Sequence, residues 1–443
     1  MDYIIAGTLC ILLLLFWMGT GLQIGLAFLL SGFIVTTLLL GLKSTLSLLG
    51  QVSYFSIATP TWVCIPLFIL MGDFAAIGGF ARLAYNGVYA LTRGIPGSLA
   101  VATCFACAVF GAISGSSIAT TAIFGRMALP EMKRLHYDKS FSAACIASAG
   151  TFASMIPPSM MMIIYALFTQ QSVAKLFAAG VIPGIITAIA YAILIIYRVR
   201  RNPRLAPPPL ATERMLTWEE KWREVGKMWP VAVTALAVFC GLYGGLFTAT
   251  EAAAAGALII LFFGFFQGTM RHLRDITGAM KDSANTTAML FLINIGALFY
   301  SRVLAVTGLP TEITALLINW EVPRSVILAG VIVIMFILGM IMVPVGIYAL
   351  TLPILFPMMV KLGYDPIWFG VICLKMTEIG AITPPVGLNV YAMKGVIPKE
   401  DNVSLEDIFR GIWPFCGCEM VLLIFLIIFP ELSTWLPELL LGK

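Results

Sequence analysis

Two Pro-Pro pairs inside apolar runs are the residues of this chain best suited to chemistry. The first lies in GTFASMIPPS, residues 150–159, and the second lies in TEIGAITPPVGLN, residues 377–389. Two successive prolines remove two N–H donors and stop the preceding residue from continuing a helix, so carbonyls one turn upstream lose their partners. Free carbonyl oxygens are good ligands for a hard, weakly bound cation such as Na⁺. We therefore expect one cation site at each break.

A second kind of interruption precedes each Pro-Pro pair. GAISGSSIATT, residues 111–121, is rich in small and hydroxyl residues, and GMIMVPVG, residues 339–346, combines glycines with a proline. Such tips leave backbone groups unpaired, which is tolerable only inside protein or beside water. We expect two re-entrant hairpins, at residues 97–126 and 322–357, whose halves are each too short to cross a membrane. Close helix packing through small residues is the alternative.

The hairpins and breaks belong to an internal repeat. Two segments have similar sequences, LPEMKRLHYD at residues 129–138 and FPMMVKLGYD at residues 356–365. Pro157 recurs as Pro384 with the same displacement of 227 positions. Because the displacement is the same for the segments and for the Pro-Pro pairs that follow them, we infer a structural duplication. Paired interruptions in the two halves of a membrane chain point to a binding site between them.

Composition predicts an all-α polytopic membrane protein. Hydrophobic residues make up 60% of the chain, charged residues 11%, and the mean hydropathy is +0.98, whereas soluble proteins have roughly 45–50% and about 25%. Apolar runs of about 20 residues, the length that crosses a bilayer, predict roughly ten or more segments. The first run lacks a basic flank and cleavage site, so we expect a retained span. The net charge of +5 requires no nucleic-acid partner, and the cysteine spacings complete no zinc pattern.

Basic residues predict the orientation. A cluster from Arg198 to Arg204 leads into a proline run at 207–209 and an amphipathic stretch with Trp218 and Trp222. The positive-inside rule makes this connector cytoplasmic, and its tryptophans suit an interfacial helix, with a solvated loop as the alternative. Basic residues flank the first hairpin far more than the second, so we expect the two copies to be inverted.

These features divide the chain into six segments. The expected segments are scaffold helices at 1–96, a first repeat core at 97–198 with its broken helix at 141–170, a linker at 199–228, scaffold helices at 229–321, a second repeat core at 322–396 with its broken helix at 366–395, and a C-terminal helix at 397–443.

Several motifs resemble one transporter family. They occur in order along nearly the whole chain: PLFILMGDF from residue 66, GAISGSSIATT, YDKSFSAA from 137, IPPS from 156, GLFTATEAAAAGA from 245, YSRVLAVTGLP from 300 and ITPPVGLN from 382. Together they resemble the large membrane subunit of tripartite ATP-independent periplasmic (TRAP) transporters. The resemblance implies the fold of the ion-transporter superfamily, an elevator-type secondary transporter in a bacterial or archaeal inner membrane that imports organic acids with sodium. It also implies two partners, a small four-helix membrane subunit and a periplasmic substrate-binding protein.

The resemblance also implies functional residues. A first sodium site is expected on Ser114, Gly115, Ser116, Gly150 and Pro157. A second is expected on Gly339, Val343, Thr377, Gly380 and Pro384. Substrate-facing groups between them are expected from Ser117, Ser159, Arg302 and Asn389. Two sodium ions and a carboxylate substrate would balance charge near the midplane, where unpaired charge is costly.

Three charged residues within apolar stretches leave alternatives open. Arg302 could clamp a substrate carboxylate, extend toward the interface or pair with Glu312. Lys375 and Glu378 lie three positions apart, so we expect them to neutralise each other, and proton coupling is the alternative.

Three function classes remain open on sequence alone. The first is the sodium-coupled transporter subunit, and the second is a standalone symporter or sodium/proton antiporter of similar build. The third, an intramembrane enzyme, is disfavoured because no Ser/His, paired-Asp or HExxH set lies at membrane depth. The sequence does not specify the substrate.

Overall fold

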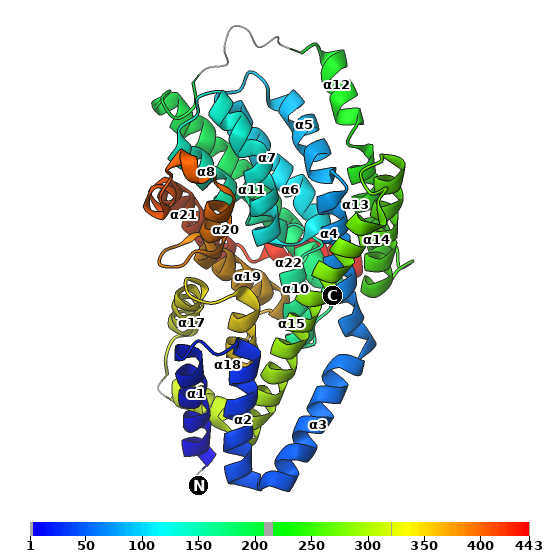
Figure 1. Cartoon of the computed structure of the whole chain (residues 1–443). Helices are drawn as coiled ribbons and strands as arrows, with labels where there is room; N and C mark the ends of the chain where they lie inside the picture. Colours follow the sequence, from blue (N-terminus) through cyan, green and yellow to red (C-terminus); the bar gives the residue numbers. More distant parts are fainter. Residues whose placement is uncertain (1–2, 208–215, 320, 443) are drawn as a thin grey trace.

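The computed structural model describes residues 3–207, 216–319 and 321–442, and all regular structure within these ranges is helical (Figure 1). The helices fall into two series with the same order, displaced by the 227 positions seen in the sequence. The first series opens with α1 Tyr3–Gly19, α2 Ile24–Leu40, α3 Leu42–Ala58, the 3₁₀ turn η1 Pro60–Val63, α4 Cys64–Ile77 and α5 Phe80–Thr92. The second opens with α13 Trp229–Tyr243, α14 Ala249–Phe266, α15 Leu273–Thr307 and α16 Leu309–Asn319. The single helix α15 spans the positions equivalent to α3 and α4.

Each series continues with a hairpin, an interrupted helix and a long helix. In the first copy these are α6 Ser98–Ser114, α7 Ser117–Arg134, α8 Lys139–Ala149, α9 Phe152–Met155, α10 Met160–Thr169 and α11 Val173–Arg201. In the second they are α17 Arg324–Gly339, α18 Pro344–Lys361, α19 Pro366–Ile382, α20 Leu388–Val396, η2 Lys399–Asp401 and α21 Leu405–Ile428. Helix α12, Trp218–Gly226, lies in the linker, and α22, Glu431–Leu441, follows the second copy. The predicted inverted repeat with two hairpins and two broken helices is confirmed.

Matching caps show why the two copies begin their broken helices at the same register. Asp138 accepts the Phe141 N–H at 2.7 Å at the start of α8. Asp365, its equivalent in the second copy, accepts the N–H groups of Ile367 at 2.9 Å and Trp368 at 2.7 Å at the start of α19. A carboxylate at the N-cap satisfies donors that the helix leaves unpaired.

The number of helices that could cross a membrane is lower than predicted. Among the described residues, six helices are long and apolar enough to cross a membrane, and eight qualify if each bent pair counts as one span. The pair Lys139–Met155 and Met160–Thr169 is bent by 44° at the first Pro-Pro break. Four further apolar helices have 10–17 residues. These four are α1, α2 and α6 with 17 residues each and α17 with 16, slightly shorter than the helices that qualify.

The hairpins differ from the prediction in the lengths of their arms. The hairpin arms reach beyond the predicted ends: α7 extends to Arg134, and α18 has 18 residues and passes the length test for a span. The prediction that both halves of each hairpin are too short to cross is therefore wrong for α18. Part of the linker, residues 208–215 with most of its proline run, lies outside the described residues.

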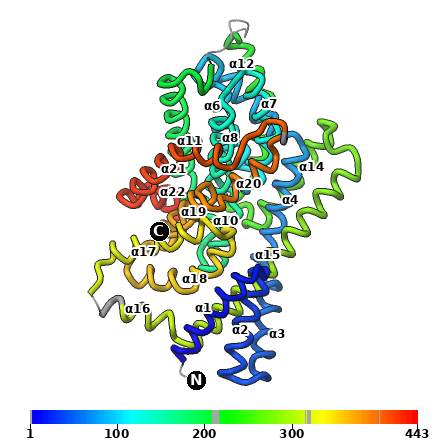
Figure 2. Tube along the Cα trace, turned by 60° about the vertical axis from the view of Figure 1, so that its left-hand side comes forward, coloured from blue at the N-terminus to red at the C-terminus, as the bar shows by residue number. Residues whose placement is uncertain are grey.

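Two separate clusters of buried side chains organise the molecule. The larger surrounds the hairpins and broken helices. The smaller joins α1, α2 and α15 and also includes Ala349 of α18. Within it the rings of Phe28 and Tyr300 lie 5.1 Å apart. Both views place α1, α2 and α3 at the end of the molecule opposite α12 (Figures 1 and 2). Most buried hairpin residues therefore pack in the larger cluster, whereas α18 of the second hairpin contributes to both clusters.

Candidate functional site

The tip of the first hairpin lies against the first Pro-Pro break. Gly115, between α6 and α7, has a φ of +62°, and its carbonyl accepts the Met160 N–H at 3.3 Å. A Cβ on Gly115 would lie 2.8 Å from the Pro158 carbonyl oxygen, so the approach requires glycine. Ser116 caps α7, and its Oγ accepts the Ala119 N–H at 3.4 Å. Tip and break thus form one junction of polar backbone and hydroxyl groups.

The other residues predicted for the first site join the same junction. The hydroxyls of Ser114 and Thr120 lie 3.0 Å apart. Gly150 ends α8, where a Cβ would lie 1.9 Å from Thr121 Oγ1 and 3.0 Å from the Ser117 carbonyl oxygen. The break itself begins at Pro157, between α9 and α10. The structure therefore brings all five predicted residues together: Ser114, Gly115, Ser116, Gly150 and Pro157.

The second hairpin repeats the junction through its backbone. A Cβ on Gly380, in α19, would lie 2.4 Å from the carbonyl carbon of Gly339, at the end of α17. The Val386 N–H, just past the second Pro-Pro pair, donates to the Met340 carbonyl at 3.3 Å. Because both residues are glycines, helices α17 and α19 can cross at this short distance.

Side chains contribute less at the second junction. Val343 precedes α18 and supplies no side-chain cap. The Thr377 hydroxyl donates to the Leu374 carbonyl within its own helix at 2.8 Å. Helix α19 ends two residues before Pro384. Of the residues predicted for the second site, Gly339 and Gly380 are in contact and Pro384 lies two residues before Val386, while Val343 and Thr377 belong to the same hairpin and broken helix. Backbone carbonyls are the main oxygen donors at this junction.

Two of the predicted substrate residues link the two repeats, and a third lies beside the first break. The Ser117 hydroxyl, in the first hairpin, donates to Glu378 Oε1, in the second broken helix, at 3.4 Å. Asn389 Nδ2, in α20, donates to the Ala147 carbonyl, in α8, at 3.4 Å. Ser159 is buried and caps α10 directly after the first break. These polar groups lie where the two copies meet.

Within the part of the chain that the structure describes, several buried oxygens in this region lack hydrogen-bond partners. They are Thr121 Oγ1, Ser148 Oγ, Glu378 Oε2 and Asn389 Oδ1. Leaving a buried acceptor unpaired costs about 1 to 3 kcal/mol, so such atoms favour a cation or water beside them. Hydroxyl, amide and carbonyl oxygens suit a hard monovalent or divalent cation better than a soft transition metal. The residues present therefore fit Na⁺.

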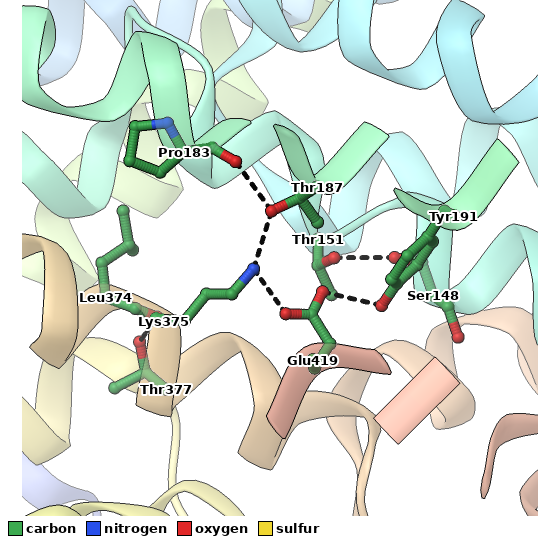
Figure 3. Close-up of polar contacts among 9 residues, drawn as sticks. All are labelled: Ser148, Thr151, Pro183, Thr187, Tyr191, Leu374, Lys375, Thr377 and Glu419. Atoms are coloured by element: carbon green, nitrogen blue, oxygen red, sulfur yellow. Dashed lines mark hydrogen bonds and ion pairs between the residues drawn. The ribbon is translucent and has the colours of Figure 1, made fainter. Parts of the chain in front are cut away.

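A buried ion pair lies beside the second broken helix (Figure 3). Lys375 Nζ is 2.5 Å from Glu419 Oε2, and the two side chains are only 2% and 3% exposed. The Tyr191 hydroxyl donates to Glu419 Oε1 at 2.7 Å, and Lys375 Nζ donates to the Thr187 hydroxyl at 2.9 Å. The prediction that Lys375 and Glu378 neutralise each other is therefore wrong. Lys375 reaches α21 and α11 instead.

Arg302 lies apart from the other predicted substrate residues. It is exposed on α15 and lines a cavity of about 690 Å³ together with Trp62 and Gln170. No residue predicted for either cation junction lines this cavity, and Ser117, Ser159 and Asn389 do not line it either. Among the described residues Arg302 makes no hydrogen bond or ion pair, so the pairing with Glu312 does not occur there.

Comparison with known proteins decides the family. Residues 9–432 match the family model described as "Tripartite ATP-independent periplasmic transporter, DctM component". The chain belongs to this family. The C4-dicarboxylate TRAP transporter large permease protein of Pseudomonas aeruginosa is 35% identical over 381 residues, covering 85% of this chain and 86% of that protein.

Two further relatives of this TRAP large permease are informative. The isethionate TRAP transporter permease protein of Oleidesulfovibrio alaskensis is 32% identical over 88% of this chain, which spans 59% of that longer protein. The solved YdaH transporter of Alcanivorax borkumensis has a TM-score of 0.57 at 14% identity, covering 89% of this chain and 90% of that one. The second likeness concerns the fold alone. These family relatives are named as transporter permeases, and this chain is a transporter subunit and not an enzyme.

Sequence reasoning about this TRAP permease missed the role of Glu419. A single glutamate in the apolar run CGCEMVLLIF was a visible signal, because a lone carboxylate in such a run needs a buried cation. The structure supplies that cation as Lys375, the only buried lysine of the described residues.

Proposed function

We propose that this TRAP large permease imports an organic acid anion together with sodium ions by an elevator-type motion. The observation that carries the proposal is the pair of junctions at which each hairpin tip contacts its own Pro-Pro break. In the first, the Met160 N–H meets the Gly115 carbonyl, and in the second the Val386 N–H meets the Met340 carbonyl. Interrupted helices at paired positions of two inverted halves are where secondary transporters hold substrate and coupling ions.

Each junction supplies the oxygens for one cation. At the first, hydroxyls of Ser114 and Ser116 add to carbonyls near Gly150, and at the second the carbonyls near Gly339 and Gly380 dominate. The unpaired oxygens of Thr121 and Asn389 would gain a partner when an ion or substrate binds. Because Ser117, Ser159 and Asn389 lie between the copies, a carboxylate bound beside them would be neutralised by the two sodium ions.

The separate packing of the N-terminal helices supports an elevator motion. The buried cluster of α1, α2 and α15 is largely separate from the core around the hairpins, and Ala349 of α18 is the one hairpin residue among its buried members. Two bodies with their own cores can slide against each other without exposing either interior. In this proposal the hairpins and broken helices move together and the cluster of α1, α2 and α15 stays fixed.

The proposal includes two partners and a location. We propose a small membrane subunit, a periplasmic substrate-binding protein and the inner membrane. The isethionate TRAP transporter permease protein of Oleidesulfovibrio alaskensis supports the first partner, because this chain spans only 59% of its length and the rest leaves room for a second permease component. The named substrates of the relatives, a C4-dicarboxylate and isethionate, support an organic anion without specifying which one.

Uptake by proteoliposomes tests the proposal. A candidate binding protein, sought among the genes that neighbour the one for this chain, is first screened by thermal shift for the anion that it binds. The permease is then reconstituted with the small subunit, and uptake of that anion is measured with and without an inward sodium gradient. We expect uptake only when sodium, both permease subunits and the binding protein are all present. Uptake indifferent to sodium contradicts the proposal, and sodium-driven uptake without the binding protein favours a standalone symporter.

A further inference from the structure

The cavity beside Arg302 is a pocket separate from the two cation junctions. Five pieces of chain enclose it: the end of α3, the turn into α4, the turn between α10 and α11, the turn between α13 and α14, and the last third of α15. Its volume of about 690 Å³ falls inside the range of roughly 300–1,000 Å³ typical of ligand pockets.

The lining of the pocket suits an anion. Arg302 is the one charged residue among the lining side chains, and it is exposed to the pocket without a hydrogen bond or ion pair within the described ranges. Thr61, Gln170 and Gln171 add hydroxyl and amide groups. The carboxylate closest in sequence to the lining, Glu251, accepts the N–H and hydroxyl of Thr248 at 2.8 and 2.9 Å and does not line the pocket. A guanidinium with no carboxylate partner favours a carboxylate or sulfonate ligand.

The pocket and the basic linker lie at opposite ends of helix α11. Helix α11 begins at the pocket with Val173 and, after 29 residues, ends at Arg201 beside the linker. A helix of that length spans about 43 Å. If the basic linker is cytoplasmic, as the positive-inside rule requires, the pocket opens on the outer side of the membrane.

Helix α10 connects the pocket with the first cation junction. It begins at Met160, directly after the break, and ends at Thr169, next to Gln170 in the pocket lining. Its ten residues cover about 15 Å. An anion in the pocket is therefore one short helix away from the junction where the two repeats meet.

We propose that this pocket is an outer receiving site, at which Arg302 binds a small organic anion before the anion reaches the junction between the repeats. The proposal rests on the proposed function only for the direction of travel. The pocket itself requires neither sodium nor the binding protein, because its lining belongs wholly to this chain.

Thiol modification of a pocket residue tests the proposal. Thr61 is exposed and lines the pocket, so Thr61→Cys gives a reporter. Cys64, which is buried but lines the pocket, is changed to serine together with the exposed Cys240 and the half-buried Cys418, and the other six cysteines are buried. The probes are a sulfonate-bearing methanethiosulfonate reagent and its trimethylammonium counterpart, applied to the full chain in nanodiscs in sodium-free buffer of low ionic strength.

The ratio of the two reaction rates reports the charge in the pocket. Arg302→Gln should lower the ratio of anionic to cationic reagent by about fivefold, as expected for loss of one charge within several ångströms in a wet site. Arg302→Lys should keep the ratio near that of the parent. Arg324→Gln, which removes an exposed arginine at the start of α17, is the matched control and should leave the ratio unchanged.

Two results would overturn the receiving site. One is a ratio that Arg302→Gln leaves unchanged, and the other is a fall in Arg302→Lys as large as the fall in Arg302→Gln. Because the measurement uses no sodium gradient and no binding protein, it remains readable even if sodium-coupled uptake fails. Conversely, sodium-coupled uptake that survives beside an unchanged thiol ratio would remove the receiving site and leave the proposed function standing.

Discussion

The two repeat cores share a backbone and differ in their side chains. The first hairpin tip carries the hydroxyls of Ser114 and Ser116, whereas Val343 occupies the position equivalent to Ser116 in the second. In the broken helices the difference reverses, because Lys375 and Glu378 stand where the first copy has Ser148 and Thr151. The backbone junction is thus the common element of the duplication, and the side chains make its two copies unequal.

This difference separates two ways of fixing a broken helix. The first copy holds its tip and break together through hydroxyls and small residues. The second copy adds the buried pair of Lys375 and Glu419, which joins α19 to α21 and, through Tyr191, to α11. Side-chain changes should therefore act on ion binding in the first copy and on stability in the second.

Breaking the ion pair should have the largest effect. Lys375→Met leaves Glu419 buried without its cation, and we expect the free energy of unfolding to fall by about 3 to 5 kcal/mol. Thermal unfolding of the purified complex, followed by tryptophan fluorescence, measures the loss. The double variant Lys375→Met/Glu419→Met should recover most of it, since it removes both charges. Lys361→Met, at the exposed end of α18, is the control, and a loss of equal size in that variant would contradict the assignment.

Adding a methyl group at the glycines should distinguish the junctions next. Gly380→Ala places a Cβ 2.4 Å from the backbone of Gly339, which no rotamer change relieves, so we expect a loss of about 3 kcal/mol. Gly150→Ala instead meets the Thr121 hydroxyl at 1.9 Å. The double variant Gly150→Ala/Thr121→Ala should therefore recover most of the loss and leave only the milder contact at 3.0 Å with the Ser117 carbonyl oxygen. Absence of this rescue would show that the first junction is as tightly fixed by backbone as the second.

Removing tip hydroxyls should affect sodium binding in the first copy alone. Ser114→Ala and Ser116→Ala should each raise the sodium concentration for half-maximal uptake about tenfold, the effect of losing one hydrogen-bonding group to a charged ligand. Val343→Ala, at the position equivalent to Ser116, should not change it. The uptake assay in proteoliposomes measures all three. Equal sodium dependence in the serine variants and the wild type would count against the first site.

The helix caps should show the smallest effect and the closest symmetry between the copies. Asp138→Ala and Asp365→Ala should each lower the free energy of unfolding by about 1 kcal/mol. The second should be the larger, because Asp365 accepts two N–H groups and Asp138 accepts one. A larger loss in Asp138→Ala would mean that contacts outside the cap dominate, and thermal unfolding again supplies the measurement.

The sequence predicted what repeats in the fold and missed what does not. The shared register located both tips and both breaks, because proline and glycine act on the backbone beside them. The partner of Lys375 could not be predicted from spacing, since Glu419 lies 44 positions away and only the packing of α19 against α21 brings them together. Arg302 was placed with the substrate residues because it lies in a family motif, while the path of α15 carries it to a different cavity.

The number of sodium ions bound by the purified permease tests the central claim most directly. Radioactive sodium binding to the wild-type chain in nanodiscs should saturate at two ions per chain, one for each junction of tip and break. The double variant Ser114→Ala/Ser116→Ala should weaken one ion and leave the other unchanged. A single ion in the wild type, or no saturable sodium binding at all, would contradict the view that the duplicated junctions are two cation sites.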